Sequence, residues 1–341
     1  MFSFGCFLEN VNLVGFDTDF FGILGEVAMC IEPQQQLLLE VVYEYLENAG
    51  LSLAAVNGHK MGCFVGYSES INLKITRNGK HRTEKIGLHS KKLRAVILVV
   101  AELACQSLVS NDTSAAILAG ANIILKYVEQ ASIYGKSSER LVDGGQSVQD
   151  GSPSGHFLSR GRQASRYGKG EDVNAVFLKR LDHALRDGDP IRAIIRGWAS
   201  NNDGRGSPPM CPGPDSQAAC IRAAYAMANL KDFETTAYIE CHGMDTTVGE
   251  SSELKGISAV FGQARSMDNP LIVGSIKSNL GDSEATSGLS GLIKIVLSIE
   301  EGSIPGTPSY SMPSSKGRAS FVIEAVSEAN ATTFFKQSIK N

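Results

Sequence analysis

Short apolar runs alternate with longer amphipathic patterns along the chain, and this alternation limits the possible folds more than any other feature of the sequence. The pattern of a helix is clearest from Pro33, a favoured first-turn residue, to Gly50. Further helices are expected over 216–230, 251–262 and 287–302. Glycine, proline or polar residues bound the runs that predict buried strands, which are 61–67, 114–120, 173–179, 191–197, 236–241 and 270–275. This order predicts an α/β protein with parallel or mixed sheets.

Composition and charge argue against several classes of protein. The formal net charge is −4 and the basic residues are scattered, so we expect no nucleic-acid partner. The longest uninterrupted apolar run, Ala95 to Ala101, is too short to cross a bilayer, so we expect no membrane association. The seven cysteines form no CxxC pair, which predicts reduced thiols in a cytoplasmic protein without a zinc site. Polar residues rich in glycine and serine predict loops over 68–92 and 135–170.

Two stretches place titratable residues where predicted strands end, which is the usual position of a site in such folds. His242 follows an apolar strand in "YIECHGMDTTVGE", and hydroxyl side chains follow it. Lys277, Asn279, Asp282 and Glu284 lie close together in "VGSIKSNLGDSEATSG". On these residues alone, a structural histidine and a capped helix start fit as well as a site does. No glycine-rich nucleotide fingerprint and no metal-ligand spacing accompanies them, so no bound cofactor or metal is expected.

Several ordered segments resemble the β-ketoacyl synthase (ketosynthase) domain of polyketide synthases, most closely the fungal iterative reducing type. The segment "FDTDFFGILGEVAMCIEPQQQLLLEVVYEYLENAGLS" is similar to the family pattern "FDxxFFgis…mDPQQRLLLE…wEALEnAG". The segments that match further along, in family order, are "MGCFVGYS", "LACQSLVSNDTSAAILAGANIIL", "VFLKRLDHALRDGDPIRAIIRG", "YIECHGMDTTVGESSE" and "NPLIVGSIKSNLGDSEATSGLSGLIKIVLSIEEGSIPGTPSY". The resemblance extends from about Phe16 to Tyr310.

The resemblance implies a thiolase-like fold with αβαβα layers, in one truncated ketosynthase domain over 1–341, with an N-terminal half at 1–190 and a C-terminal half at 191–330. The family extends an acyl chain by decarboxylative Claisen condensation in secondary metabolite biosynthesis. A cysteine takes the acyl group from the phosphopantetheine arm of an acyl carrier protein, and two histidines assist. The implied partners are therefore a carrier protein, other polyketide synthase domains and a second copy in a homodimer.

Single positions of this chain can be compared with the site residues of the family, and some of them differ from the family pattern. His242 falls on the first catalytic histidine, whereas Lys277 and Glu284 fall on the family's lysine and glutamate. Asp282 replaces the second histidine, and a carboxylate only accepts hydrogen bonds where a neutral imidazole can also donate one. Arg94 lies where the nucleophilic cysteine belongs. The substrate-binding residues implied by the resemblance are Thr246 and Asn279.

Cys105 falls on a second, non-catalytic cysteine of the family pattern, so we expect it to pack inside a helix. The chain is also shorter than the family before Arg94 and near "KGRASFVIEAV". These two gaps imply the loss of strands around the nucleophile and near the C-terminus, together with the "NSFGFGGTNAH" loop.

Three interpretations follow for the function. The first is a ketosynthase-type protein that is catalytically impaired or inactive in condensation. The second is an active acyltransferase within a polyketide synthase, in which Cys63 or Cys241 serves as the nucleophile. The third is a non-enzymatic fragment, or the product of a decayed or misjoined gene. Whether the chain is an enzyme is left open between these three.

Overall fold

The first β-sheet is built from three strands, and its central strand is buried along almost its whole length. The computed structural model describes residues 5–6, 8, 11, 15–67, 74–77, 80–83, 96–123, 169–203, 213–243, 247–262, 265–266 and 269–306. Strand β5 (Ala115–Asn122) lies in the centre of this sheet, parallel to β2 (Met61–Tyr67) and antiparallel to β7 (Asp172–Lys179). Leu118 at the middle of β5 is fully buried. An unbroken apolar run is what a strand covered on both faces requires.

The second sheet pairs β8 (Tyr238–Glu240) with β9 (Ile272–Gly274) in parallel. Helices α8 (Pro214–Met227) and α9 (Thr247–Phe261) pack against one another at the outer face of this sheet. The core between them and the strands contains Phe261, which is 1% exposed.

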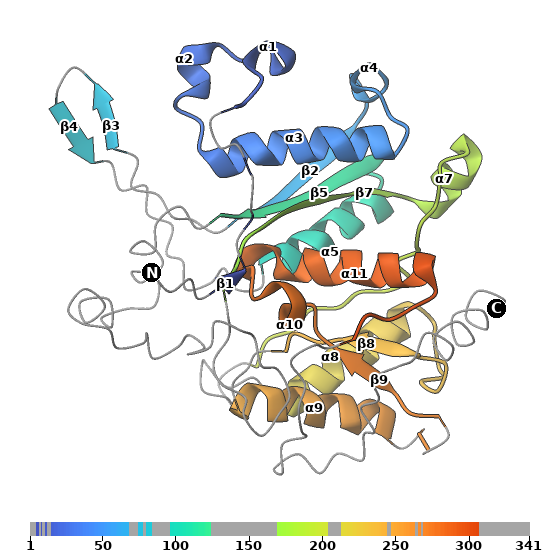
Figure 1. Cartoon of the computed structure of the whole chain (residues 1–341). Coiled ribbons are helices and arrows are strands. Elements are labelled where there is room, and N and C mark those ends of the chain that lie inside the picture. Colours follow the sequence, from blue (N-terminus) through green and yellow to red (C-terminus); the bar gives the residue numbers. More distant parts are fainter. Residues whose placement is uncertain are drawn as a thin grey trace, which may run out of the picture.

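Three further helices complete the layers (Figure 1). Helix α3 (Pro33–Asn48) covers the outer face of the first sheet. Helices α5 (Val96–Val109) and α11 (Ser287–Glu301) lie between the two sheets. The order is therefore helix, sheet, helices, sheet, helices, which confirms the predicted thiolase-like αβαβα layering.

Short elements connect these layers. Strand β1 pairs in parallel with β6, and β3 forms an antiparallel hairpin with β4. Among these elements, β6 and α10 lie at the functional site. The bounds of the short elements are β1 (Gly5–Cys6), α1 (Thr18–Phe21), α2 (Gly25–Ala28), α4 (Leu53–Val56), β3 (Lys74–Arg77), β4 (Lys80–Thr83), β6 (Lys169–Gly170), α7 (Leu181–Asp187), α10 (Lys277–Leu280) and the 3₁₀ helix η4 (Glu284–Thr286).

Two predictions of local structure were wrong. Residues 191–197 form no strand, although the chain there is described throughout. Their apolar pattern is suited to a sheet, but a strand exists only where a neighbour supplies hydrogen bonds. Gly197 instead packs on α8, where a Cβ would lie 2.4 Å from the carbonyl oxygen of Ala224. The hairpin β3–β4 lies within 68–92, which the sequence indicated to be a loop.

The middle layer has a small apolar core at the first sheet. Ile97 on α5, Leu118 on β5 and Leu289 on α11 form a buried cluster, with Phe64 and Val176 packed against it. Cys105 on α5 is also buried, which confirms its predicted place inside a helix. Burial raises the pKa of its thiol, with a smaller contribution from Glu102, so the reactive thiolate is disfavoured.

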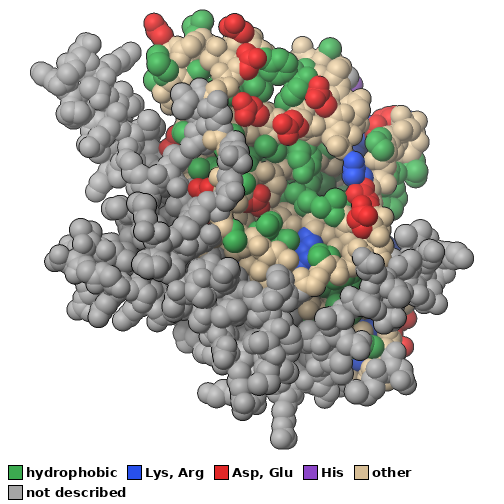
Figure 2. Space-filling view, in the orientation of Figure 1, with side chains coloured by type: hydrophobic (Ala, Val, Ile, Leu, Met, Phe, Trp, Pro, Cys, Tyr) green, Lys and Arg blue, Asp and Glu red, His purple; other side chains and the backbone are tan. Residues whose placement is uncertain are grey.

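The surface is mixed in character. Figure 2 shows acidic side chains over α3 and the short helices beside it, with hydrophobic side chains gathered in the middle of the same face. Exposed large hydrophobic residues include Leu39 on α3 and Leu297 on α11. No described helix is long and apolar enough to cross a membrane.

Replacing Leu289 with alanine tests the middle layer. Leu289 is 1% exposed, so Leu289→Ala should lower the free energy of unfolding by about 2–5 kcal/mol, through lost burial and the cavity that remains. The matched control is Leu297→Ala on the same helix, where the side chain is 51% exposed and a change within about 0.5 kcal/mol is expected. Urea denaturation measures both, and equal losses would contradict this assignment of the core.

Candidate functional site

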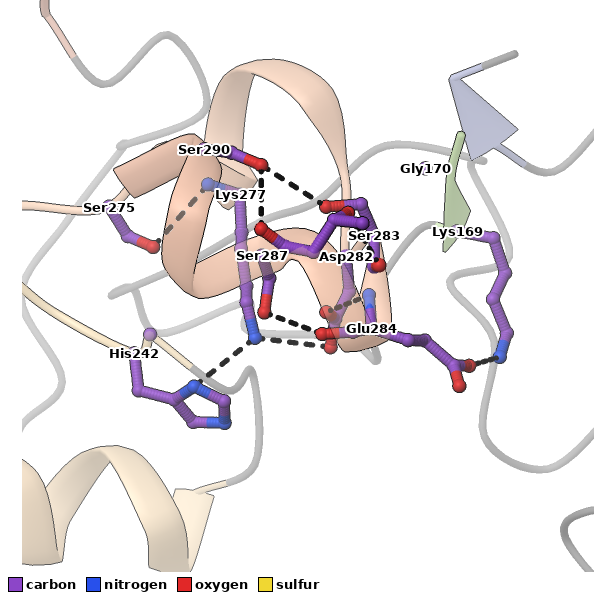
Figure 3. Close-up of polar contacts among 12 residues, drawn as sticks. Lys169, Gly170, His242, Ser275, Lys277, Asp282, Ser283, Glu284, Ser287 and Ser290 are labelled. Carbon is purple, nitrogen blue, oxygen red and sulfur yellow. Dashed lines mark hydrogen bonds and ion pairs between the residues drawn. The ribbon is translucent and has the colours of Figure 1, made fainter. Parts of the chain in front are cut away.

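The ammonium group of Lys277 is the centre of the candidate site. Lys277 begins α10, directly after β9, and its side chain is 3% exposed. Its Nζ lies 3.3 Å from Nδ1 of His242 and 3.2 Å from Oδ2 of Asp282. Figure 3 shows the lysine reaching between these two residues, which come from different elements. Lys277 and His242 thus meet at this cation although they are 35 positions apart in the sequence.

His242 follows β8 and is held there through its backbone. The carboxylate of Glu253 on α9 accepts hydrogen bonds from His242 N at 2.6 Å and Gly243 N at 3.0 Å. Gly243 has φ +60°, and a Cβ would lie 2.6 Å from Oγ of Ser275, so only glycine fits without strain. The imidazole itself is exposed. A fixed backbone with an accessible ring suits a group that acts on a bound molecule.

The turn that carries Asp282 is positioned by close backbone contacts. Gly281 has φ +76°, a conformation that favours glycine. Gly170 on β6 donates its N–H to the carbonyl oxygen of Asp282 at 3.0 Å, and a Cβ on Gly170 would lie 2.3 Å from the carbonyl oxygen of Leu280. The approach of β6 to this turn therefore also requires a glycine.

Glu284 points away from the lysine at the centre. Its Oε1 forms an ion pair with Nζ of Lys169 at 2.5 Å, and in Figure 3 it extends to the opposite side of the turn from His242. Glu284 also has φ +48°, an uncommon conformation for a residue with a side chain. The ion pair with β6 helps to hold this strained residue in place. The described residues of the site thus include two cation–carboxylate pairs, and the lysine of the Lys277–Asp282 pair contacts the histidine.

Asp282 is ionised in this environment. Burial by itself raises the pKa of the carboxyl, but the Lys277 ammonium, the charge that His242 carries when it is protonated, and the hydrogen bond from Glu284 N outweigh burial and hold the pKa below its ordinary value. The bond from Glu284 N to Oδ1 is 3.0 Å long. An aspartate in this state accepts hydrogen bonds and cannot supply a proton near neutral pH.

The lysine also sets the proton position on the histidine. An ammonium group only donates hydrogen bonds, so the Nδ1 atom that faces Lys277 at 3.3 Å accepts one. The neutral imidazole then carries its proton on Nε2, which lies on the side of the ring away from the lysine in Figure 3. This tautomer can donate a hydrogen bond to a carbonyl oxygen or to an enolate.

A buried polar cluster lies behind the Asp282 turn. Asp172 at the start of β7 accepts hydrogen bonds from Ser290 and from Asn174 at 2.8 Å. Burial raises the pKa of the Asp172 carboxyl, although hydrogen bonds from Ser290, Ser283 and Asn174 oppose the rise. Ser283 adjoins Asp282 in the sequence, so this cluster connects the turn to the first sheet.

The structure brings together part of the predicted site. His242, Lys277 and Asp282 meet, whereas Glu284 pairs with Lys169. Asn279 is exposed on α10, and its Oδ1 accepts a hydrogen bond from Ser278 Oγ at 3.0 Å. The remaining two predicted site residues, Arg94 and Thr246, lie outside the described part of the chain.

The two cysteines considered as replacement nucleophiles occupy unfavourable positions. Cys241 belongs to the apolar core between the second sheet and its outer helices, where it is 6% exposed. Cys63 lies on β2 in the first sheet as an exposed residue, but desolvation raises the pKa of its thiol. Neither environment favours a thiolate.

Sequence reasoning missed three residues at the site. Lys169 pairs with Glu284, and Glu253 holds the backbone of His242, but neither stands near its partner in the sequence. The third is Cys6 on β1, whose Sγ lies 3.9 Å from the carbonyl oxygen of Asn279. The position of Glu253 eleven residues after His242, on a predicted helix, was the one available signal. Among the described residues, no cluster could hold a metal ion.

Known proteins similar to this chain share its fold and sequence pattern. Residues 2–97 match the family described as Beta-ketoacyl synthase, N-terminal domain, and residues 192–311 match its C-terminal domain. The chain is 42% identical to the highly reducing polyketide synthase claI of Penicillium crustosum, over 91% of this chain and 13% of that protein. It is 42% identical to the low-reducing polyketide synthase drtA of Aspergillus calidoustus, over 89% of this chain and 13% of that protein.

Solved ketosynthase structures agree with this likeness. The oxazolomycin ketosynthase domain OzmH KS7 of Streptomyces albus JA3453 superposes with a TM-score of 0.74 at 26% identity, over 89% of this chain and 55% of that one. The ketosynthase from module 6 of the bacillaene synthase of Bacillus subtilis 168 gives a TM-score of 0.74 at 25% identity, over 90% of this chain and 54% of that one. The chain therefore spans about an eighth of the length of these two curated synthases and about half of each solved ketosynthase. The two matched domains, the relatives and the layered fold together show that this chain belongs to the β-ketoacyl synthase family, as a ketosynthase domain of the polyketide synthase type.

Proposed function

We propose that this chain binds acyl or malonyl thioesters, carried on the phosphopantetheine arm of an acyl carrier protein, without catalysing the decarboxylative condensation of its family. The carrier protein and other polyketide synthase domains are its proposed partners, in the cytoplasm, and the chain works as a homodimer. Its proposed organisation is a single domain with halves at 1–190 and 191–330. His242, Lys277 and Glu284 are proposed as the retained part of the site, with Thr246 and Asn279 contacting the substrate.

One observation carries this proposal: the carboxylate of Asp282, which the resemblance aligns with the family's second histidine, forms an ion pair with Lys277 at 3.2 Å. Decarboxylation of a malonyl thioester develops negative charge on the thioester oxygen as an enolate forms. Donors that face this oxygen stabilise the charge, whereas an ionised carboxylate nearby repels it. Asp282 therefore opposes the step that a second histidine would assist.

Binding of a thioester requires fewer catalytic groups than condensation does. The Nε2–H of His242 suits a hydrogen bond to a thioester carbonyl, and Lys277 keeps that proton in place through Nδ1. Binding develops no new negative charge at the thioester oxygen, so Asp282 does not oppose binding as it opposes formation of the enolate. The replacement of the nucleophile by Arg94, as the resemblance implies, removes covalent transfer and leaves recognition of the arm.

Asp282→His tests the proposed loss of decarboxylation. Wild-type protein should bind malonyl-carrier but release no carbon dioxide, because one imidazole and a carboxylate cannot stabilise the enolate. Asp282→His should raise the release of carbon dioxide from malonyl-carrier by about 10²-fold or more, since a second donor then faces the thioester. Asp282→Asn is the matched control, because the amide removes the charge without supplying an imidazole. His242→Ala in the Asp282→His background should abolish the gain.

Covalent acylation of the wild-type chain provides the opposing outcome. Intact-mass spectrometry after incubation with acyl-carrier should show no adduct on any cysteine. A stable acyl adduct, or release of carbon dioxide by the wild-type chain, would establish an active acyltransferase instead. If the chain fails to bind the carrier at all, it is a non-enzymatic fragment, and sequencing of the transcript would then show whether a nucleophile segment is encoded upstream of Arg94.

Lys277→Met tests the ion pair by its effect on stability. The variant leaves the Asp282 carboxylate, 14% exposed, without its cation and should lower the free energy of unfolding at pH 7 by about 3–5 kcal/mol. The folded-state pKa of Asp282 lies below its ordinary value, so the wild-type pair stabilises above the unfolded pKa and this contribution is lost as pH falls through the folded pKa. The difference in the free energy of unfolding between Lys277→Met and the wild-type protein should therefore become smaller as the pH falls.

The second variant needed is Lys277→Met with Asp282→Asn, which removes both charges and should recover most of the loss in urea denaturation. The matched control is Arg180→Met, which breaks the exposed pair between Arg180 and Asp182, whose side chain is 60% exposed. Arg180→Met should lower the free energy of unfolding by markedly less than Lys277→Met does. A double variant as unstable as Lys277→Met would show that the lysine stem, rather than the ion pair, holds this region.

A further inference from the structure

A second buried lysine–carboxylate pair lies at the carboxyl end of β8. Lys294 on α11 places its Nζ 2.9 Å from Oε2 of Glu240, and both side chains are less than 10% exposed, at 4% and 8%. The same ammonium donates a hydrogen bond to the hydroxyl of Tyr238 at 2.8 Å, and that hydroxyl donates one to Glu240. The three side chains form a closed polar cluster between the middle helices and the second sheet.

The other oxygen of Glu240 reaches across the sheet. Its Oε1 accepts a hydrogen bond from the backbone N–H of Ile276 at 2.5 Å. Glu240 stands two residues before His242 on the β8 side, and Ile276 stands immediately before Lys277 on the β9 side. The hydrogen bond between Glu240 and Ile276 thus joins the segment that carries His242 to the segment that carries Lys277.

Close packing leaves little freedom in this arrangement. A Cβ on Gly291 of α11 would lie 3.1 Å from Cγ of Glu240, so the helix presses directly on the side chain. Buried ion pairs are often no more stabilising than apolar side chains of the same size. An apolar residue at 240, however, could not accept the Ile276 N–H, which would then lose its partner. The polar cluster therefore has a role that burial of apolar area cannot replace.

We infer that Glu240 is a positioning residue, which Lys294 and Tyr238 hold in place, and that its bond to Ile276 fixes the distance between Lys277 and His242. Within the described part of the chain, Glu240 bonds to Lys294, Tyr238 and Ile276. It acts through the two segments that end β8 and begin α10. This inference concerns the resting chain and does not depend on the proposed binding of carrier-linked thioesters.

Glu240→Gln separates positioning from simple stability. Ile276 N–H and the Lys294 ammonium bond to different oxygens of Glu240, and glutamine has an oxygen at only one of these two positions. The variant should therefore weaken the Ile276 bond while Lys294 is present. Adding Lys294→Met removes the competing cation, so the glutamine oxygen can return to Ile276 and its NH₂ can donate to Tyr238. The double variant should restore the geometry that the single variant loses.

The readout is the tautomer of His242, observed by nitrogen NMR of chain labelled with ¹⁵N-histidine and assigned with His242→Gln. Wild-type protein should show an unprotonated Nδ1 and a protonated Nε2. Glu240→Gln should reduce this preference by roughly two- to tenfold, the effect expected when one hydrogen bond is lost. The double variant should return towards the wild-type spectrum, although both proteins have a lowered thermal midpoint.

Lys179→Met is the matched control. Lys179 is 18% exposed and pairs with Asp187 at 2.7 Å and Asp189 at 2.5 Å, at the end of β7. This variant should lower the unfolding midpoint and leave the His242 signals unchanged.

Lys294→Met alone is not used, because it leaves a buried carboxylate without a cation and can abolish folding. Tyr238→Phe, which keeps both charges, is a milder variant for the same measurement.

The inference is overturned if Glu240→Gln and Lys179→Met lower stability alike while the His242 tautomer stays at its wild-type ratio in both. It is equally overturned if the double variant shows a larger change at His242 than Glu240→Gln does. A crystal structure of Glu240→Gln in which Nζ of Lys277 still lies 3.3 Å from Nδ1 of His242 would have the same meaning.

Discussion

A lysine ammonium removed from water is the constraint on which the site depends. Lys277 is 3% exposed, and a cation in that position needs an anion and further hydrogen-bond partners. Asp282 supplies the charge, and His242 supplies a neutral acceptor. Because the aspartate must turn back towards the lysine, the chain between them passes through a glycine of positive φ at 281. The local backbone is therefore a consequence of one buried charge.

The layered fold determines where this charge lies. The two parallel strands of the second sheet end side by side, and the segments after them carry His242 and Lys277. The separate two-stranded pair β1–β6 contributes through β6, whose Gly170 and Lys169 contact the turn at Asp282 and Glu284. The site is consequently built from the second sheet together with β6, which lies far from it in the sequence.

Local patterns in the sequence were sufficient for most of the fold. Five of the six predicted strands formed, each hydrogen-bonded to a neighbouring strand, and α3 ends at the glycine-containing boundary that the sequence indicates. The exception is 191–197, since an apolar pattern reports the suitability of a segment for a sheet but not the presence of a neighbour to pair with.

The site was less accessible to sequence reasoning. The meeting of His242 with Lys277 was implied by family resemblance and not by spacing, because 35 residues separate them. The pairing of Glu284 with Lys169 could not be anticipated, since it spans 115 positions and depends on a two-residue strand. Contacts of this kind arise from the packing of layers, which local periodicity does not encode.

The extended segment after α7 has a consequence for how the isolated chain behaves in solution. Ile191, Ile194 and Ile195 are 41%, 54% and 40% exposed, and no described strand pairs with them. Natural sheets protect such apolar, extended backbone with charges, prolines or a covering element. Here Arg192 bonds to Glu300 and Asn48 and ties the segment to both α11 and α3, which keeps it apart from other strands. Salt screens the ion pair between Arg192 and Glu300 and would therefore favour self-association through this apolar segment, so the tendency of the chain to aggregate depends on ionic strength.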